Sequence, residues 1–405
     1  MWTTRLKRRR NAAAMTDVCV IGGGASGMAA AISARMENPD ISISILEKNG
    51  RVGKKLLATG NGRCNFTNAS CPEFNDIISF FHALGIKERV EQQGRVYPYN
   101  GRAEDVLSAF ESYLNSHGIE IIPHFPVERL IVGETGKITV CGADREITSG
   151  KALLATGGKA GPQFGCTGDG YVMAREAGHS LAKIAPALTP VECIGDFEKL
   201  KGLRAKASVT LLKKGVPLAA EEGEVQFTEY GLSGICVFNL SRYIKLEGCG
   251  FTDYDIEVDF LPETGTGELT LELKPRLESG YAAPDDLLVS IVPGGLKGFV
   301  LSRAGIKPEA GAISGKQAAL IAHFLKHLKF TVSNVKGWKS AQCTSGGVPL
   351  DEISLDTMES KIVRGLFFAG EMIDYDGPCG GYNLNNAWAT GMRAGKAMAA
   401  NVQDS

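Results

Sequence analysis

A glycine-rich turn between an apolar strand and an alanine-rich helix constrains this chain more than any other feature. Residues 17–32 run from Asp-Val-Cys-Val-Ile through Gly-Gly-Gly-Ala-Ser-Gly into Met-Ala-Ala-Ala-Ile, and the strand-like run Ile-Ser-Ile-Ser-Ile-Leu at 41–46 precedes Glu47. A strand, a G-x-G-x-x-G turn, a helix, a second strand and an acid are typical of a Rossmann-like dinucleotide-binding unit. The carboxylate of Glu47 can accept hydrogen bonds from both ribose hydroxyls of an adenosine.

Each position of the turn has a steric or electrostatic reason. Gly22 permits the tight turn, Gly24 lets a pyrophosphate approach the backbone, and Gly27 lets the helix pack closely on the strand. Ala25 and Ser26 open the helix, whose free N–H groups and positive dipole end favour phosphate. The pattern therefore predicts an α/β fold that binds a dinucleotide.

Composition limits the function classes. The chain has 405 residues, enough for two or three domains, and its 44% hydrophobic and 22% charged residues are typical of a globular protein. A formal net charge of -1 provides no global attraction to nucleic acid, so no nucleic-acid partner is predicted. Outside the Rossmann motif we find no stretch with the length and apolarity of a membrane span.

The cysteines and histidines do not form a recognisable metal site. The ten cysteines are irregularly spaced without a C-x-x-C pair, which favours reduced thiols and a cytoplasmic location. His323 and His327 are four residues apart on an expected helix, but no H-E-x-x-H motif surrounds them, so a surface helix is favoured over a metal site. The sequence therefore predicts no metal.

The N-terminus invites a misreading. Basic residues between Arg5 and Arg10 precede an uncharged run and superficially resemble a secretory signal, but that run is the glycine-rich strand itself. We expect residues 1–14 to be a disordered extension, with Met15 as a candidate native start.

The secondary-structure pattern predicts a discontinuous nucleotide-binding domain. Residues 15–188 and 344–405 form that domain, and residues 189–343 form an insertion. Within the insertion, strand patterns at about 189–262 and 329–343 predict a β module, and leucine-rich runs at about 263–328 predict helices.

Glycine-containing loops follow apolar strands in three distant segments, residues 22–27, 156–158 and 370–383. In an open parallel sheet such loops line one ligand crevice. Together they favour one extended cofactor, and a flavin dinucleotide fits better than a nicotinamide alone because a second G-x-G-x-x-G unit is absent.

Four longer motifs carry a family resemblance. They are residues 55–68 (Lys-Leu-Leu-Ala-Thr-Gly-Asn-Gly-Arg-Cys-Asn-Phe-Thr-Asn), 153–158, 344–348 and 366–384. With these the chain resembles the bacterial FAD-dependent oxidoreductase family typified by 3-dehydro-bile-acid Δ4,6-reductase, which includes aminoacetone-oxidase-like flavoproteins. The resemblance implies FAD, NAD(P)H as co-substrate, and a two-dinucleotide-binding-fold (Rossmann-like) core with an inserted β-barrel plus helical lobe. Cys379 and Asn385–Asn386 depart from the family pattern, so the surface facing the substrate is expected to differ.

The matched positions and their chemistry suggest roles in cofactor binding. The lysines after Glu47 could supply phosphate charge, although a solvated basic loop explains each equally well. Arg63 and Asn65 are expected at the pyrophosphate or flavin ring, and the intervening Cys64 fits a space-filling role better than a redox role. These candidates, with one glycine of the same loop, are Lys48, Lys54, Lys55, Gly60, Arg63, Cys64 and Asn65.

Further candidates come from the middle and the end of the chain. A backbone contact to adenine is expected at the first residue of a strand near 127, and an acid near the ribityl chain is expected after residue 370. A helix start near 382 can stabilise negative charge on the reduced flavin. The only candidate proton donor is the phenol of Tyr382, for which a structural role is equally plausible. The set is Val127, Thr156, Gly157, Gly370, Glu371, Asp374, Gly381, Tyr382 and Asn383.

Three functional hypotheses follow. The first is NAD(P)H-driven reduction of a C=C bond conjugated to a ketone in a 3-oxo bile-acid or steroid-like substrate, which needs an apolar slot supplied by the insertion. The second is an oxidase of aminoacetone or small amino acids that uses O2. The third is a flavoprotein that binds RNA or a protein partner. A small hydrophobic substrate is favoured, and the sequence does not indicate an oligomeric state.

Overall fold

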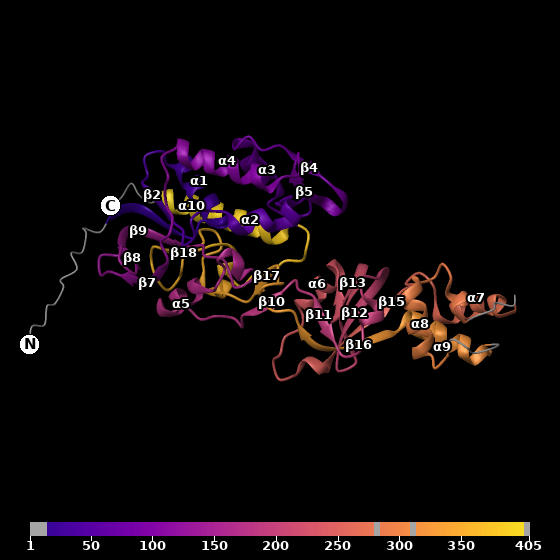
Figure 1. The fold of residues 1–405 in the computed structure, drawn as a ribbon. Coiled ribbons are helices and arrows are strands. Elements are labelled where there is room, and N and C mark those ends of the chain that lie inside the picture. The colour runs from indigo at the N-terminus through magenta and orange to yellow at the C-terminus, as the bar shows by residue number, and fades with distance from the viewer. Residues whose placement is uncertain (1–13, 279–283, 308–312, 401–405) are drawn as a thin grey trace, which may run out of the picture. The chain divides into compact units, whose positions relative to one another are not determined.

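The protein consists of two compact units in the computed structural model, which describes residues 14–278, 284–307 and 313–400 (Figure 1). The Rossmann unit comprises Met1–Ala185 and Cys343–Ser405, and the inserted unit comprises Pro186–Gln342. Each unit has its own hydrophobic core.

The expected N-terminal extension is one residue too long. Residues 1–13 lie outside the described part of the chain, but Ala14 already belongs to the first strand and pairs with Ile147. Met15, the candidate native start, is the second residue of that strand and is exposed.

A seven-stranded sheet forms the centre of the Rossmann unit, in the order β6–β2–β1–β9–β8–β7, with β18 also paired to β9. β6, β2, β1, β9 and β18 run parallel, whereas β7, β8 and β9 form an antiparallel meander. β9 is long enough to pair with β8 along its first half and with β18 along its last three residues. The strands are β1 (Ala14–Ile21), β2 (Ile43–Leu46), β6 (Glu120–Ile122), β7 (Val127–Val132), β8 (Ile138–Gly142), β9 (Glu146–Leu154) and β18 (Leu366–Phe368).

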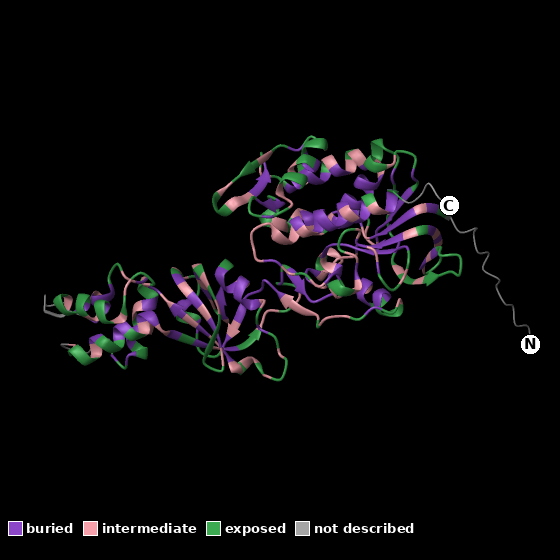
Figure 2. Ribbon diagram, turned by 180° about the vertical axis from the view of Figure 1, so that it is seen from behind, coloured by how far each residue is buried: buried purple, intermediate pink, exposed green. Residues whose placement is uncertain are grey.

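Two helices from opposite ends of the chain pack side by side against this sheet. α1 (Ala25–Glu37) and α10 (Tyr382–Ala400) approach so closely that a Cβ on Gly391 would lie 2.4 Å from the Ser26 carbonyl oxygen. A Cβ on Gly395 would lie 2.2 Å from the carbonyl oxygen of Ala30. Both helices are largely buried, and so are residues 18–21 of β1 and the whole of β2 (Figure 2).

The remaining elements of the Rossmann unit correct two sequence expectations. From sequence, the polar, glycine-punctuated residues 49–68 predict a loop, and Val-Tyr-Pro-Tyr at 96–99 predicts an irregular break between helices. The structure instead forms the short helix α2 in the first segment and strand β5 over most of the second. A partner strand on each side makes β5 the centre of a three-stranded sheet, β3–β5–β4. The elements are α2 (Lys54–Ala58), β3 (Thr67–Asn68), α3 (Phe74–Ala83), β4 (Glu88–Val90), β5 (Arg95–Pro98), α4 (Ala103–Ser116) and α5 (Asp169–Glu176).

A closed barrel, in the order β11–β14–β13–β12–β15–β16, forms the β part of the inserted unit. In β15 buried residues alternate with less buried ones, which is the period of a strand with one face in a core. Phe227, Tyr254 and Phe330 are at most 1% exposed and fill that core. The strands are β11 (Val191–Cys193), β12 (Arg204–Lys213), β13 (Val216–Thr228), β14 (Gly231–Ser233), β15 (Tyr254–Asp259) and β16 (Leu328–Val335).

Helices complete the inserted unit. Three of them follow the barrel strand β15 and precede β16, as the leucine-rich runs predict, and one lies against β13. The helices are α6 (Ile235–Ser241), α7 (Thr266–Glu278), α8 (Gly294–Arg303) and α9 (Gly315–Lys326). Outside both main sheets, β10 (Ala185–Ala187) pairs with β17 (Cys343–Ser345). The predicted α/β fold with an inserted barrel and helical part is confirmed.

Candidate cofactor site

The glycine-rich turn has the geometry that a pyrophosphate requires. Gly22 has φ +107°, and a Cβ there would lie 2.5 Å from the Ala155 carbonyl oxygen; a Cβ on Gly27 would lie 2.0 Å from the Gly22 carbonyl oxygen. By contrast, a Cβ on Gly24 would meet only that Ala155 oxygen, at 4.0 Å. Gly24 therefore borders open space at the start of α1, where no side chain caps the helix.

Glu47 directly follows β2 and is 8% exposed. Its Oε2 accepts a hydrogen bond from the Gly23 backbone N–H (3.0 Å), and its Oε1 accepts from the backbone and side-chain N–H groups of Asn49 (2.8 and 2.7 Å). A carboxylate has about four lone-pair sites, so one remains for a ribose hydroxyl. Glu47 therefore has an acceptor site for one ribose hydroxyl, not for the two that the sequence suggested, and its role in ribose binding stays a prediction.

The three candidate lysines all contact oxygens of the protein. Lys48 Nζ lies 2.5 Å from Asp169 and 2.6 Å from Thr167 Oγ1. Lys54 Nζ donates to Asn49 Oδ1 at 3.3 Å from an exposed position. Lys55 forms an ion pair with Glu371, which is developed below.

The loop that carries most of the family resemblance divides between surface and core. Arg63 pairs with Glu91 and lies 4.0 Å from the ring centroid of Tyr97, so its guanidinium contacts protein groups. Asn65 Oδ1 accepts from the Val96 N–H at 3.1 Å. Cys64 is completely buried, and burial raises the pKa of its thiol to about 12, which suits a space-filling residue better than a reactive thiolate.

Gly60 and the middle segment have further geometric constraints. Gly60 has φ +57°, and a Cβ there would lie 3.0 Å from the Asn65 backbone nitrogen. Val127 begins β7 and pairs with Gly142. Just before it, the Phe125 N–H donates to the Glu47 carbonyl oxygen at 2.9 Å, which places this segment beside the ribose-binding candidate.

The third loop begins with Gly370 in the short 3-10 helix η8 (Gly370–Met372). Gly370 has φ +68°, and a Cβ there would lie 2.7 Å from Ser26 Oγ at the start of α1. Gly157 has φ +72°, and a Cβ there would lie 3.9 Å from Glu371 Oε2. Thr156 Oγ1 lies 3.1 Å from Met372 Sδ. The loops at the beginning, middle and end of the chain therefore meet at one edge of the sheet.

The segment around the start of α10 contacts residues near β3 and the preceding loop at Gly377. A Cβ on Gly381 would lie 2.3 Å from the Thr67 carbonyl oxygen, so only glycine fits there. The Tyr382 hydroxyl lies 2.8 Å from Ser70 Oγ, and the Asn383 side chain exchanges hydrogen bonds with the Gly377 backbone at 2.8 and 2.9 Å. Upstream, the Asp374 N–H donates to the Val348 carbonyl oxygen at 2.9 Å.

Sequence reasoning missed two residues that surround Glu371. The Thr344 N–H donates to Glu371 Oε1 at 3.0 Å, and Thr344 Oγ1 accepts from the N–H groups of Lys159 and Ala160. The Tyr171 hydroxyl donates to the Glu371 carbonyl oxygen at 2.7 Å. Thr344 is the first residue of the family motif at 344–348, so the sequence marked this position but did not indicate its contact with Glu371.

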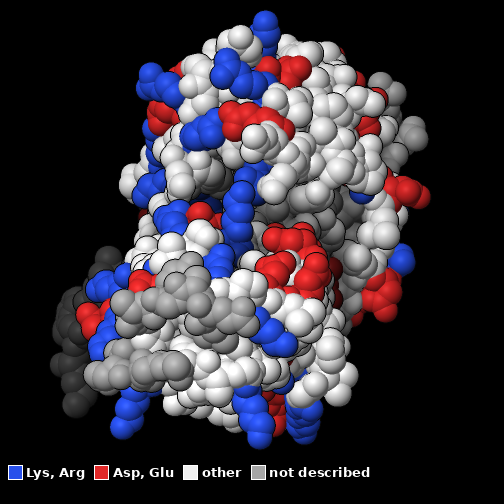
Figure 3. All heavy atoms as spheres, turned by 90° about the vertical axis from the view of Figure 1, so that its right-hand side faces the viewer, with Lys and Arg blue, Asp and Glu red and all other residues white. Residues whose placement is uncertain are grey.

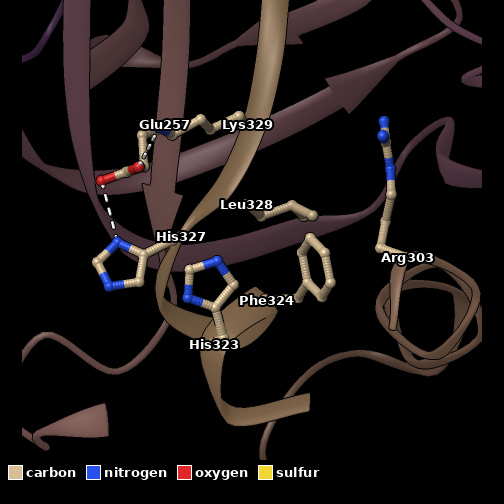
Figure 4. A pocket seen from close by; sticks show the side chains of 7 residues that line it. All are labelled: Glu257, Arg303, His323, Phe324, His327, Leu328 and Lys329. Atoms are coloured by element: carbon tan, nitrogen blue, oxygen red, sulfur yellow. Dashed lines mark hydrogen bonds and ion pairs between the residues drawn. The ribbon is translucent and has the colours of Figure 1, made fainter. Parts of the chain in front are cut away.

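The inserted unit contains a separate cavity of about 300 Å³ against the barrel (Figure 4). Its walls are mostly charged or polar, so it lacks the apolar lining that a steroid would need. His327 Nδ1 lies 3.2 Å from Glu257 Oε1, but within the described ranges no group of three histidine, cysteine or acidic residues could hold a metal. The lining residues are Glu257, Arg303, His323, Phe324, His327, Leu328 and Lys329.

The fold and the cradle define the class of protein. The turn at Gly24, the carboxylate after β2 and the convergence of three loops fit an extended dinucleotide, and the chain is an FAD-dependent oxidoreductase with a Rossmann-like FAD domain. No helix of the described segments is long and apolar enough to span a membrane.

The chain belongs to the HI0933-like family, whose Rossmann domain matches residues 16–75 and 72–397. It is 36% identical over 408 residues to 3-dehydro-bile acid delta(4,6)-reductase of Clostridium scindens, covering 95% of this chain and 99% of that protein. It is 27% identical to the ribosomal RNA dihydrouridine synthase of Haemophilus influenzae, covering 92% and 95%.

A solved structure supports the fold. The 3-ketosteroid-delta4-(5alpha)-dehydrogenase of Rhodococcus jostii RHA1 superposes with a TM-score of 0.51 at 14% identity, over 95% of this chain and 97% of that chain. At this identity the likeness concerns architecture alone.

Proposed function

We propose that this protein reduces a C=C bond conjugated to a ketone in a 3-oxo bile-acid or steroid-like substrate, with NAD(P)H as electron donor. The observation that carries the proposal is the 36% identity to a bile acid reductase over nearly the whole of both chains. The alignment covers 95% of this chain and therefore extends over both units, the inserted unit included.

The residues of the Rossmann unit would divide the work as follows. FAD, when bound, supplies two-electron transfer. The start of α1 beside Gly24 would hold the pyrophosphate, and Glu47 would accept a hydrogen bond from one ribose hydroxyl. The N-terminus of α10 would stabilise negative charge on the flavin of the bound FAD. The Tyr382 hydroxyl, held by Ser70 Oγ, would keep a proton available at the same helix start.

A second candidate substrate is a uracil base in RNA. The 27% identical relative is named for dihydrouridine formation, which saturates a C=C bond conjugated to a carbonyl and so uses the same type of reaction. This candidate needs a surface for the phosphates and bases around the reacting uracil.

One surface of the Rossmann unit has the required side chains. Arg89 lies on β4 and pairs with Tyr97 of β5, and Lys87 directly precedes that strand. The charged groups of Arg89 and Lys87 lie 4.3 and 5.0 Å from the Tyr99 ring centroid, and Arg63 covers Tyr97. We call Arg63, Lys87, Arg89, Tyr97 and Tyr99 the cation–aromatic surface.

Two observations rank RNA second. The cation–aromatic surface includes an ion pair with Glu91, which neutralises one of its charges. Basic and acidic side chains are interspersed on the face of the molecule in Figure 3, and the net charge is -1. RNA-binding surfaces are instead dominated by positive charge.

An anaerobic assay of the flavin-loaded protein tests these substrates. NAD(P)H should bleach the flavin, and a 3-oxo-4-ene steroid should restore its colour while the saturated ketone is formed. Recolouring by uridine-containing RNA but not by the steroid would select the second candidate. Recolouring only after air is admitted, with turnover of aminoacetone, would replace both by the oxidase hypothesis.

A surface variant separates the two reductase candidates further. Lys87→Ala with Arg89→Ala should leave steroid reduction unchanged, because neither residue belongs to the proposed cofactor cradle. If RNA is the substrate, the same variant should weaken RNA binding and reduce its dependence on salt concentration.

A further inference from the structure

Lys55 and Glu371 form an ion pair between segments that are 316 residues apart in sequence. Lys55 lies on α2 and Glu371 lies in η8, and Lys55 Nζ is 2.6 Å from Glu371 Oε2. The two side chains are 27% and 17% exposed, so water solvates neither charge fully. Opposite charges in such surroundings depend on each other much more than a surface pair does.

Glu371 connects several parts of the cradle at once. Its other oxygen accepts from the Thr344 N–H at 3.0 Å, and its carbonyl oxygen accepts from the Tyr171 hydroxyl at 2.7 Å. The loop at Gly157 lies beside the ion-paired oxygen. A shift of this carboxylate would therefore disturb the beginning, middle and end of the chain where they meet.

We propose that Lys55 and Glu371 act as one neutral charge unit that sets the geometry and the local potential of the FAD cradle, with Lys55 as a positioning residue and not a phosphate ligand. The proposal depends on FAD binding alone and is independent of the substrate. A lysine that serves a phosphate needs a free ammonium group, whereas the ammonium of Lys55 is already held by a carboxylate.

The surroundings support a charged pair. Burial lowers the pKa of Lys55, but the charge of Glu371 and its hydrogen bond raise the pKa more, so the net direction is upward and the ammonium persists. The neighbouring thiols of Cys166 and Cys343 have pKa values raised by burial and stay uncharged at neutral pH. Lys54, one residue earlier, is exposed and donates to Asn49 Oδ1.

A double-mutant cycle on FAD affinity tests the unit. Lys55→Met and Glu371→Gln should each weaken FAD binding to the apoprotein by about tenfold or more, because each leaves a poorly solvated charge without its partner. The double variant should bind about as well as the better single variant, since no lone charge remains. Lys137→Met, at an exposed lysine in the turn between β7 and β8, is the control and should bind FAD within about twofold of the wild type.

The reduction potential of the bound flavin provides a second test. If the pair acts through its charge, the two single variants should shift this potential in opposite directions, which a purely structural role would not produce. Lys55→Met leaves a negative charge and should lower the potential, whereas Glu371→Gln leaves a positive charge and should raise it. The double variant should return close to the wild type. Lys55→Arg keeps the charge and should preserve the potential, so it also serves if Lys55→Met fails to fold.

Distinct results would overturn the proposal. If Lys55 binds a phosphate, Glu371→Gln should free the lysine and leave FAD binding unchanged or tighter while Lys55→Met weakens it. Additive losses in the double variant would show two independent residues. Potential shifts of the same sign in both single variants would show that the pair does not act through its charge.

Discussion

The Rossmann unit and the helical part of the inserted unit use glycine differently. In the Rossmann unit a Cβ on Gly22, Gly27 or Gly391 would lie within 2.5 Å of a backbone oxygen. In the inserted unit a Cβ on Gly298 of α8 or Gly267 of α7 would meet nothing within 4 Å. Close approach of the backbone requires glycine at the Rossmann-unit positions, whereas the packing around Gly298 and Gly267 leaves room for a side chain.

This difference has a functional meaning. Where two helices and a strand approach at backbone distance, backbone contact fixes the spacing of these elements. A helix with space around its glycines is held by its apolar stripe instead, and α8 buries Leu296, Val300 and Leu301. Substitutions should therefore destabilise the Rossmann unit at these glycines and the helical part of the inserted unit at its buried side chains.

The largest effect is expected where α10 crosses α1. Gly391→Ala places a methyl group 2.4 Å from the Ser26 carbonyl oxygen, and backbone cannot move aside as a side chain can. We expect a loss of about 3 kcal/mol or more in the free energy of unfolding and a drop in Tm of roughly 6 to 12 °C. Thermal melts of the FAD-loaded protein measure it; an unchanged Tm would mean that the two helices are farther apart in solution.

The next effect separates ligand contact from packing. Gly24→Ala adds a methyl group with only Ala155 O nearby, at 4.0 Å, and φ at this position is -82°, which alanine adopts freely. We expect the apoprotein to keep its Tm while FAD affinity falls by roughly a hundredfold, about 2.7 kcal/mol, because the methyl group occupies the pyrophosphate position. FAD titration with parallel melts measures both, and normal FAD binding would place the cofactor elsewhere.

Much of this cradle could be predicted from sequence because its geometry depends on glycines that the backbone conformation requires. The positions of Gly22, Gly24 and Gly27 follow from the turn itself, and α10 begins at Tyr382, directly after Gly381, where the sequence predicts a helix start. Such constraints act between neighbours in sequence, so a local pattern is sufficient to reveal them.

The side-chain partners could not be predicted in the same way. The partner of Lys55 is 316 residues away, and Arg63 contacts Glu91 and Tyr97, which its sequence motif does not reveal. The partner of each side chain depends on which loops meet in three dimensions. In sequence, a basic residue near a glycine-rich turn has the same appearance whether it binds a phosphate or a carboxylate. The strand β5 was missed for a related reason, since Pro98 and its tyrosines look like a break without their partner strands.

A buried ion pair of the inserted unit provides the counterpart of Lys55–Glu371. Lys326 is 8% exposed, and its Nζ lies 2.8 Å from Asp259 Oδ2. We expect Lys326→Met to cost about 2 kcal/mol in the free energy of unfolding, since Asp259 loses its partner, and to leave FAD affinity unchanged. Denaturant unfolding and FAD titration measure the two effects. Lys329→Met removes a 53% exposed lysine and is the control, expected within about 0.5 kcal/mol of wild type.

The smallest effect has the opposite sign and tests the open glycines directly. Gly298→Ala, in the exposed interior of α8, should raise the free energy of unfolding by about 0.5 to 1 kcal/mol, because alanine restricts the unfolded chain and favours helix. Gly295→Ala in the same helix is the matched comparison, since its Cβ would lie 2.6 Å from Leu203 Cδ1 and the side chain must move. Denaturant melts should therefore rank Gly298→Ala above both the wild type and Gly295→Ala. If Gly298→Ala were as damaging as Gly391→Ala, the inserted helices would be packed as tightly as the cradle, and the contrast between the two units would fail.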